Sequence, residues 1–153
     1  MALHISLTVA IALVALTAAV ALWYSVREAA PPSESAPSVA RAQRKAQRYG
    51  VLLGIVEGGA LLAVLVALFS VPSGSSETWV VGLAALCVAL MLTVWAAWLR
   101  PLNLTIAGWR PDAPPDDWTK QRARWSRLHR VRILFAVVAL ALLIMGLFPS
   151  STA

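Results

Sequence analysis

Four long apolar runs account for most of this 153-residue chain and constrain its fold more than any other feature. Each is close to the roughly 20 residues that an α-helix needs to cross the hydrocarbon core of a bilayer. Backbone groups in a bilayer must satisfy their own hydrogen bonds, so such runs form helices. We therefore predict an all-α membrane protein, a single domain of four transmembrane helices at about residues 5–26, 51–71, 79–99 and 131–148.

The composition supports this class and excludes several functions. Hydrophobic residues make up 59% of the chain and charged residues 13%. In soluble domains, roughly half of the residues are apolar and about a quarter are charged. The net charge of +6 is not accompanied by a nucleic-acid-binding motif, so we expect no nucleic-acid partner. A single cysteine, Cys87, excludes an internal disulfide and a cysteine zinc site. No Lys or Arg precedes the first run, which favours a retained helix over a cleaved signal peptide.

The positive charges predict the orientation. All 13 Lys and Arg lie between Arg27 and Arg48 or between Arg100 and Arg132, on one side of the predicted bundle. The positive-inside rule makes this side cytoplasmic, with loops at about 27–50 and 100–130 and both termini outside the cytoplasm of a cell membrane. The expected partners there are the bilayer and its anionic lipid headgroups.

The first of these loops has two parts. Pro31–Ser38 is rich in turn-forming residues and predicts a linker. Residues 40–49 are basic and predict a helix that runs along the membrane surface.

Glycines and one carboxyl group mark the second run. Gly50, Gly54 and Gly58 recur at every fourth position and predict a smooth helical face against which a neighbouring helix packs closely. Glu57 follows Gly50 by seven residues and therefore lies on that face. An intramembrane carboxyl group is costly unless it is paired, so Glu57 is either a site residue or part of an ion pair between helices.

The long helix predicted from Trp118 into the last run carries a chemically dense stripe. Pro114 and Pro115 followed by Asp116 and Asp117 indicate its start. Spacings of 4, 3, 4 and 3 put five side chains on one face: Trp118, Arg122, Trp125, His129 and Arg132. The opposite positions are basic and predict a solvated or headgroup-facing side: Lys120, Arg124, Arg127 and Arg130.

Two interpretations of this stripe stay open on periodicity alone. One is an aromatic belt with a basic collar, which many membrane proteins carry at the interface. On this view the face binds lipid headgroups or a partner protein without catalysis, and Glu57 and Arg132 hold two helices together. The other is a Trp-lined pocket with His129 and two Arg directed into it, closed by Asn103 and Trp109 from the preceding loop.

The spaced residues from Trp98 to Met145 resemble the anthrone oxygenase-like family of small four-helix membrane proteins. The resemblance is carried by Pro-x-Asn, Ala-Gly-Trp, Asp-Trp, Arg-x-Arg-Trp, His and Arg, which lead into the final run. These motifs stand at Pro101–Asn103, Ala107–Trp109, Asp117–Trp118, Arg122–Trp125, His129 and Arg132.

The resemblance implies a cofactor-independent monooxygenase, since a few members of this family are implicated in the oxidation of anthrones to anthraquinones. The implied substrate is a hydrophobic polycyclic aromatic or quinone-type molecule. His129 would remove a proton, because histidine is the side chain that titrates near neutral pH. Arg132, Asn103 and Arg122 would stabilise the resulting oxyanion, and the substrate would stack on Trp109, Trp118 or Trp125, with Glu57 nearby.

We expect no metal. The two histidines, His4 and His129, lie at opposite ends of the predicted bundle. Glu57 with His129 would supply fewer than the three protein ligands usual for catalytic zinc.

Overall fold

The computed structural model describes residues 2–29, 35–110 and 112–148, and these residues form five α-helices, one π-helical turn and no strand. The elements in chain order are α1 (Ala2–Ala29), α2 (Ala36–Ser70), α3 (Ser76–Val94), the π turn (Trp95–Leu99), α4 (Arg100–Ala107) and α5 (Trp118–Met145).

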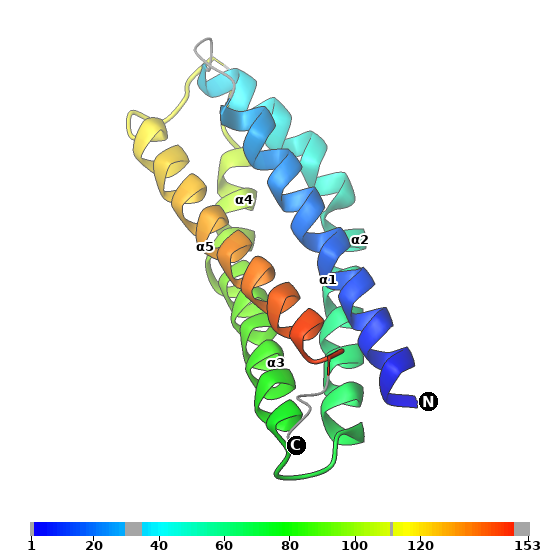
Figure 1. The fold of residues 1–153 in the computed structure, drawn as a ribbon. Coiled ribbons are helices and arrows are strands. Elements are labelled where there is room, and N and C mark those ends of the chain that lie inside the picture. The colour runs from blue at the N-terminus through cyan, green and yellow to red at the C-terminus, as the bar shows by residue number, and fades with distance from the viewer. Residues whose placement is uncertain (1, 30–34, 111, 149–153) are drawn as a thin grey trace.

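Four rods of helix form the bundle, and each is long and apolar enough to cross a membrane. Because α3, the π turn and α4 follow one another without a break, they make up the third rod. Figure 1 shows the rods side by side, with α1 beginning and α5 ending at the same end of the bundle. The all-α, four-span prediction is confirmed. The chain is multi-pass in architecture.

Neighbouring rods run in opposite directions. Helix α1 packs against α2 and α5, and α3 packs against the same two helices. Helices α2 and α5 therefore occupy diagonal corners of the bundle and run in the same direction (Figure 1). A contact between α2 and α5 must accordingly cross the centre of the bundle.

The basic segment before the second span differs from expectation. The surface helix predicted for residues 40–49 is part of α2, which runs without a break from Ala36 to Ser70. Ala36, Val39 and Ala40 are buried, because this part of α2 packs against α4 and the segment after it. Most of the predicted linker, residues 30–34, lies outside the described part of the chain.

The basic residues of α2 also have a structural role that the surface-helix prediction did not include. Arg44 donates from Nη1 to the carbonyl oxygen of Ala107 at 2.8 Å and to that of Trp109 at 3.4 Å. Gln47 donates from Nε2 to the carbonyl oxygen of Asn103 at 3.2 Å. The last carbonyl groups of a helix lack intrahelical donors and carry partial negative charge. Arg44 therefore fastens the end of α4 to α2, and Gln47 adds a second contact one turn earlier.

The third rod continues beyond the predicted end of its span. Residues 100–107, expected in a loop, form α4. Pro101 has no backbone N–H and its ring crowds the preceding turn, so the α-helical pattern is interrupted before it. The π turn occupies that position, and the N–H of Arg100 bonds to the carbonyl oxygen of Trp95. A π turn adds one residue to the helix and so changes which side chains face inward afterwards.

The fourth rod is one continuous helix, as predicted. Asp117 is the residue that precedes its first turn, but its carboxylate does not bond to the backbone of that turn. Asp117 Oδ1 instead accepts a hydrogen bond from Gln121 Nε2 at 2.9 Å. The helix ends at Met145, three residues before the predicted boundary.

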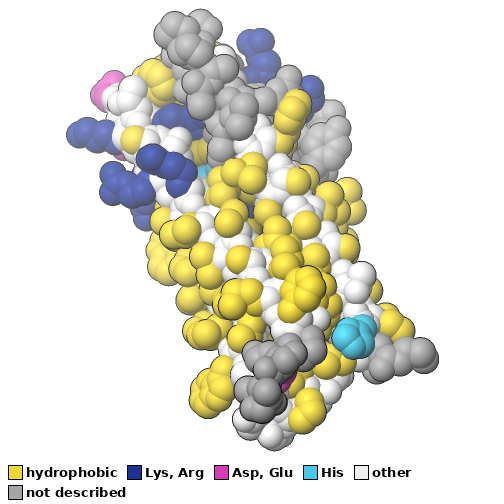
Figure 2. All heavy atoms as spheres, in the orientation of Figure 1, with side chains coloured by type: hydrophobic (Ala, Val, Ile, Leu, Met, Phe, Trp, Pro, Cys, Tyr) yellow, Lys and Arg dark blue, Asp and Glu magenta, His cyan; other side chains and the backbone are white. Residues whose placement is uncertain are grey.

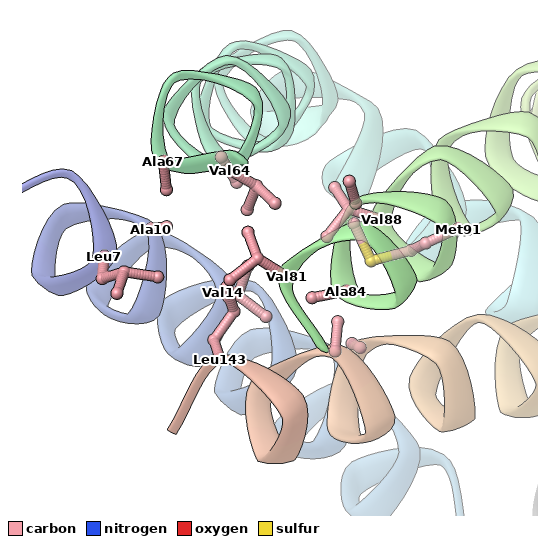
Figure 3. Close-up of a cluster of buried hydrophobic side chains, with 14 of the residues drawn as sticks. Leu7, Ala10, Val14, Val64, Ala67, Val81, Ala84, Val88, Met91 and Leu143 are labelled. Atoms are coloured by element: carbon pink, nitrogen blue, oxygen red, sulfur yellow. The ribbon is translucent and has the colours of Figure 1, made fainter. Parts of the chain in front are cut away.

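Small apolar side chains fill the half of the bundle away from α4. Every rod contributes to this cluster, which includes Leu7, Val14, Val64, Val81, Val88, Ala139 and Leu143 (Figure 3). On α5 the buried positions Arg132, Ala136, Ala139 and Leu143 repeat at spacings of 4 and 3. This heptad-like spacing, with Ala and Val at many positions, lets the helices pack closely.

The described Lys and Arg side chains gather at one end of the bundle, which we call the basic end. Figure 2 shows them at the top of the molecule, above a body whose surface is mostly hydrophobic. Large apolar side chains such as Ile55, Phe69 and Leu134 are exposed on that body. This distribution suits a lipid-facing surface, because acyl chains rather than water surround it.

Enlarging a buried alanine should destabilise the bundle. Ala139 is fully buried in the apolar cluster, whereas the adjacent Val138 is 39% exposed. We expect Ala139→Leu to lower the thermal unfolding temperature in detergent, because overpacking a filled core costs about 1–3 kcal/mol. Val138→Leu is the matched control and should leave that temperature unchanged. Equal unfolding temperatures for the two variants would contradict the packing described here.

Candidate functional site

The inward face of α5 carries three buried polar or aromatic side chains at its basic end. Trp125, His129 and Arg132 are each less than one-tenth exposed. Trp118 and Arg122 lie on the same side and are half-buried. The predicted common face is confirmed. The side chains predicted for the opposite face are all exposed: Lys120, Arg124, Arg127 and Arg130.

Trp125 is held by three neighbours. Its ring stacks on that of His129, with centroids 4.7 Å apart and an interplanar angle of 14°. The guanidinium carbon of Arg122 lies 4.8 Å from the Trp125 ring centroid, within cation–π range. The indole N–H donates to Asn103 Oδ1 at 2.6 Å. Trp125 is therefore held both through its ring face and through its indole N–H.

The contact with Trp125 also fixes the Asn103 amide. An indole N–H can only donate, so the atom of Asn103 that faces it must be the carbonyl oxygen. The amide nitrogen of Asn103, with two N–H donors, is then directed away from Trp125. Asn103 can therefore donate to another acceptor while it holds the indole.

His129 has a defined tautomer when its ring is neutral. Its Nε2 lies 3.1 Å from the backbone carbonyl oxygen of Ala21 on α1. A carbonyl oxygen can only accept, so Nε2 carries the proton. Nδ1 is then the nitrogen with a free lone pair, and it is the atom of His129 that can accept a proton.

An ion pair between Arg132 and Glu57 crosses the centre of the bundle. Nη2 of Arg132 on α5 contacts Oε1 of Glu57 on α2, and both side chains are buried. Charges at such depth persist only when they are paired, because desolvation is costly. Among the described residues, Arg132 Nε has no hydrogen-bond partner and neither does Glu57 Oε2. Each member of the pair therefore has a buried polar atom left without a partner.

A cavity of about 680 Å³ lies on the basic-end side of this ion pair. Its polar lining includes Arg132, His129, Asn103 and Trp125, which α4 and α5 bring together. The remaining lining residues come from α1, α2 and the third rod, among them Tyr24, Gln43, Gln47, Gly50, Gly54, Trp95, Leu99 and Arg100. Such a volume lies within the range of small-molecule sites.

The cavity opens towards the side of the bundle between α2 and α4. Ile55 on α2 and Leu104 on α4 both line it, although they are 66% and 58% exposed. Arg100, also exposed, lies on the same rim. The rim therefore carries both apolar and charged side chains.

Helix capping and the π turn position the α4 wall of this cavity. Trp95 and Leu99 lie in the π turn, and Asn103 follows one helical turn later. The extra residue of the π turn re-phases the helix, so that all three side chains line the cavity. Gln47 donates to the carbonyl oxygen of Asn103 and Arg44 to that of Ala107, and these contacts hold α4 against α2.

The sequence matches the anthrone oxygenase family over residues 46–142, nearly two-thirds of the chain. The chain belongs to the anthrone oxygenase family. No curated protein and no solved structure matches it. The matched segment of this anthrone oxygenase family member contains Glu57, Asn103, Trp125, His129 and Arg132.

The structure brings only some of the predicted site residues to the cavity. His129, Arg132, Asn103 and Trp125 line it, and Glu57 is joined to it through Arg132. Three others lie beside the cavity without lining it: Trp109 is buried between α2 and α5, Trp118 packs against the same cluster, and Arg122 lies over Trp125. Across the described residues, no three His, Cys, Asp or Glu side chains gather where they could hold a metal ion.

The predicted packing of a helix against the glycine stripe is wrong for Gly50 and Gly58. A Cβ atom added at Gly50 or Gly58 would meet no atom within 4 Å, and one added at Gly54 would meet only the Trp95 ring at 3.7 Å. Of the three positions, only Gly54 has a neighbour within 4 Å, and that neighbour is a side chain of the third rod. Gly50 and Gly54 instead line the cavity, and Gly58 is exposed.

Several cavity residues of this family member were not predicted. Gln43, Gln47 and Arg100 were assigned to a surface helix or a loop, and Tyr24 to the end of the first span. A signal was present in α2, where Ala36, Val39, Ala40 and Gln43 recur at helical spacing and are all buried. That pattern indicates a packed face on the basic segment rather than a helix lying on lipid.

Breaking the ion pair should destabilise this anthrone oxygenase family member. Glu57→Gln and Arg132→Gln each leave a buried group without its partner, and such a loss typically costs about 3–5 kcal/mol. We expect both single variants to unfold at lower temperature in detergent. The double replacement Glu57→Leu with Arg132→Met should recover part of the loss, because it leaves no unpaired charge.

Glu77→Gln is the matched control for this experiment, since Glu77 lies at the start of α3, away from the basic end. It should unfold like the native protein. If the double replacement were as unstable as the sum of the two single variants, the ion pair would not be the source of the effect.

Proposed function

We propose that this protein is a cofactor-independent oxygenase that converts a planar, anthrone-type substrate to the corresponding quinone in the cavity between α2, α4 and α5. The observation that carries the proposal is the position of His129. Its ring is buried at the cavity wall, Ala21 holds its Nε2 proton, and its Nδ1 is the nitrogen that can accept a proton. Membership of the anthrone oxygenase family supports the same chemistry.

The proposed reaction balances with dioxygen as the only co-reactant. His129 Nδ1 removes a proton from the carbon opposite the carbonyl group of an anthrone, which leaves an electron-rich enolate. The enolate transfers electrons to dioxygen and forms a carbon–oxygen bond, and protonation gives a hydroperoxide. Loss of water from the hydroperoxide leaves the second carbonyl group. One oxygen atom of dioxygen enters the quinone, and the other leaves as water.

Two groups in the cavity suit the developing oxyanion. Arg132 Nε is a buried donor without a hydrogen-bond partner among the described residues. The Asn103 amide nitrogen is a second donor, because its oxygen is held by Trp125. Donors that are already oriented stabilise a developing charge without reorganising. Arg122 does not line the cavity and would contribute through its contact with the Trp125 ring.

The lateral opening suggests how a hydrophobic substrate reaches the cavity. Anthrones partition into membranes, and the rim formed by Ile55 and Leu104 faces the side of the bundle. We propose that the substrate enters from the bilayer. If the positive-inside rule holds for the described Lys and Arg, the opening lies in the cytoplasmic half of the membrane.

Replacement of His129 tests the proposal. Purified protein in detergent under oxygen should convert anthrone to anthraquinone faster than the spontaneous oxidation. We expect His129→Ala to lower the enzymatic rate by about 10²–10⁴-fold, the usual contribution of a general base. His4→Ala is the matched control, because His4 is the other histidine and is exposed near the start of α1.

The rate of anthraquinone formation is followed by its absorbance, and the unfolding temperature of each variant shows that it is folded. Unchanged turnover in folded His129→Ala would refute the role of His129. Absence of turnover in the native protein would refute oxidation of anthrone.

A second function is favoured by the exposed basic face of α5, which would bind anionic lipid headgroups without any catalysis. This face carries Lys120, Arg124, Arg127 and Arg130. Replacing all four with Gln should abolish any extra thermal stability that phosphatidylglycerol gives over phosphatidylcholine in nanodiscs, since each basic residue near an anionic surface contributes about 1 kcal/mol. A preference for phosphatidylglycerol that survived the replacement would argue against this function.

A further inference from the structure

The ion pair sets the register between α2 and α5. Glu57 and Arg132 face each other across the bundle, and the two helices run in the same direction (Figure 1). Equal steps towards the basic end therefore reach similar levels on both helices. Gly54 precedes Glu57 by three residues and His129 precedes Arg132 by three, so Gly54 and His129 lie at similar levels of the bundle. Gly50 precedes Glu57 by seven residues and Trp125 precedes Arg132 by seven, so these two also lie at similar levels.

Glycines on α2 thus lie across the cavity from the rings of α5. Neither Gly50 nor Gly54 has a backbone conformation that requires glycine, since the single positive φ in the described residues is at Gly74. A Cβ atom at Gly50 would meet no atom within 4 Å, and one at Gly54 would meet only the Trp95 ring, at 3.7 Å. Glycine weakens a helix relative to alanine, so its presence at these two levels needs another explanation. The explanation is the cavity that both glycines line together with Trp125 and His129, with the Trp95 ring beside Gly54.

The two walls of this space suit a flat molecule. Trp125 and His129 stack on each other along α5, so one face of each ring is covered and the ring edges remain for other contacts. Ring edges are electropositive and favour contact with the π face of another aromatic system. The opposite face of a planar ligand would lie on the smooth backbone at Gly50 and Gly54. A side chain on that wall would occupy the volume of the ligand.

A charged group marks one end of the space. Arg132 is more than nine-tenths buried, lines the cavity, and has a free Nε donor among the described residues. Arg132 lies at the level of the ion pair, farther from the basic end than the Trp125 and His129 rings. A ligand in the space would therefore direct an ionised or hydrogen-bonding oxygen towards Arg132 and extend its rings towards Gly50.

We propose that Gly50 and Gly54 form the floor of a slot that selects planar polycyclic aromatic ligands carrying an acidic oxygen. The inference rests on the proposed function for the class of substrate, and it adds the residues that determine specificity. The slot selects by thickness: a planar ligand fits between the ring edges and the α2 backbone, and a bulky three-dimensional one does not.

Binding of a stable planar probe tests the slot independently of turnover. 1,8-Dihydroxyanthraquinone should quench tryptophan fluorescence of the detergent-solubilised protein saturably, and triptycene, a rigid non-planar three-ring hydrocarbon, should not compete with it. We expect Gly54→Ala to weaken binding of the planar probe by about tenfold, because overpacking a site of fixed width is unfavourable. Gly50→Leu, whose Cβ has open space, should abolish saturable binding.

Gly58→Ala and Gly58→Leu are the matched controls. Gly58 continues the same spacing on α2, is exposed and has no neighbour within 4 Å, but does not line the cavity. Both controls should bind the probe like the native protein. The unfolding temperatures of the Gly50 and Gly54 variants should not fall, because alanine and leucine favour helix more than glycine does.

The possible results separate the slot from the oxygenase. The slot is refuted if Gly50→Leu binds the planar probe normally, if the Gly58 variants lose binding equally, if triptycene competes, or if the native protein does not bind the probe. If the slot variants lose binding as expected and the native protein does not oxidise anthrone, the slot stands and the oxygenase fails. If Gly50→Leu still oxidises anthrone at the native rate, the oxygenase stands and the slot fails.

Discussion

The buried contact between Glu57 and Arg132 is the interaction on which the arrangement of this bundle depends. It joins the two diagonal helices, α2 and α5, across the centre of the molecule. Both side chains are buried, so each charge requires the other. The contact therefore sets the relative height of α2 and α5 and the rotation of each helix about its axis. Every side chain that follows at helical spacing is placed by that setting.

The ion pair divides the bundle into two parts of different character. On one side, Ala and Val side chains from all four rods fill the interior and leave little space (Figure 3). On the basic-end side, the rings of Trp125 and His129 lie opposite glycines, and the interior opens into a cavity. The same heptad-like spacing continues through both parts of α5. What changes is the size of the residue that α2 presents at each level.

Local sequence was sufficient to predict the spans and the inward face of α5. The four apolar runs, the helix start at Asp117 and the spacing of Trp125, His129 and Arg132 all follow from rules that concern neighbours along the chain. The resemblance carried by the C-terminal third also led to the family that the matched residues 46–142 show. These predictions needed no knowledge of how the helices pack.

The failures concern relations between helices. The glycines of α2 have the spacing of a packing motif, but no described atom of another helix approaches a Cβ at Gly50 or Gly58, and only the Trp95 ring approaches one at Gly54. Gly50 and Gly54 line a cavity instead. Basic residues before the second span resemble a surface helix, whereas Arg44 holds the end of α4. In each case a pattern along one helix is compatible with several partners. Only the partner determines the outcome.

The sequence by itself therefore determined which segments cross a bilayer and which face of each segment is polar, because these depend on composition and helical period. The tertiary structure decided what each polar or small side chain does. It paired Glu57 with Arg132. The Ala21 carbonyl oxygen places the proton of neutral His129 on Nε2, and the Trp125 indole N–H fixes the orientation of the Asn103 amide. The physical reason is that burial, pairing and empty space belong to contacts between distant segments, and no segment contains that information alone.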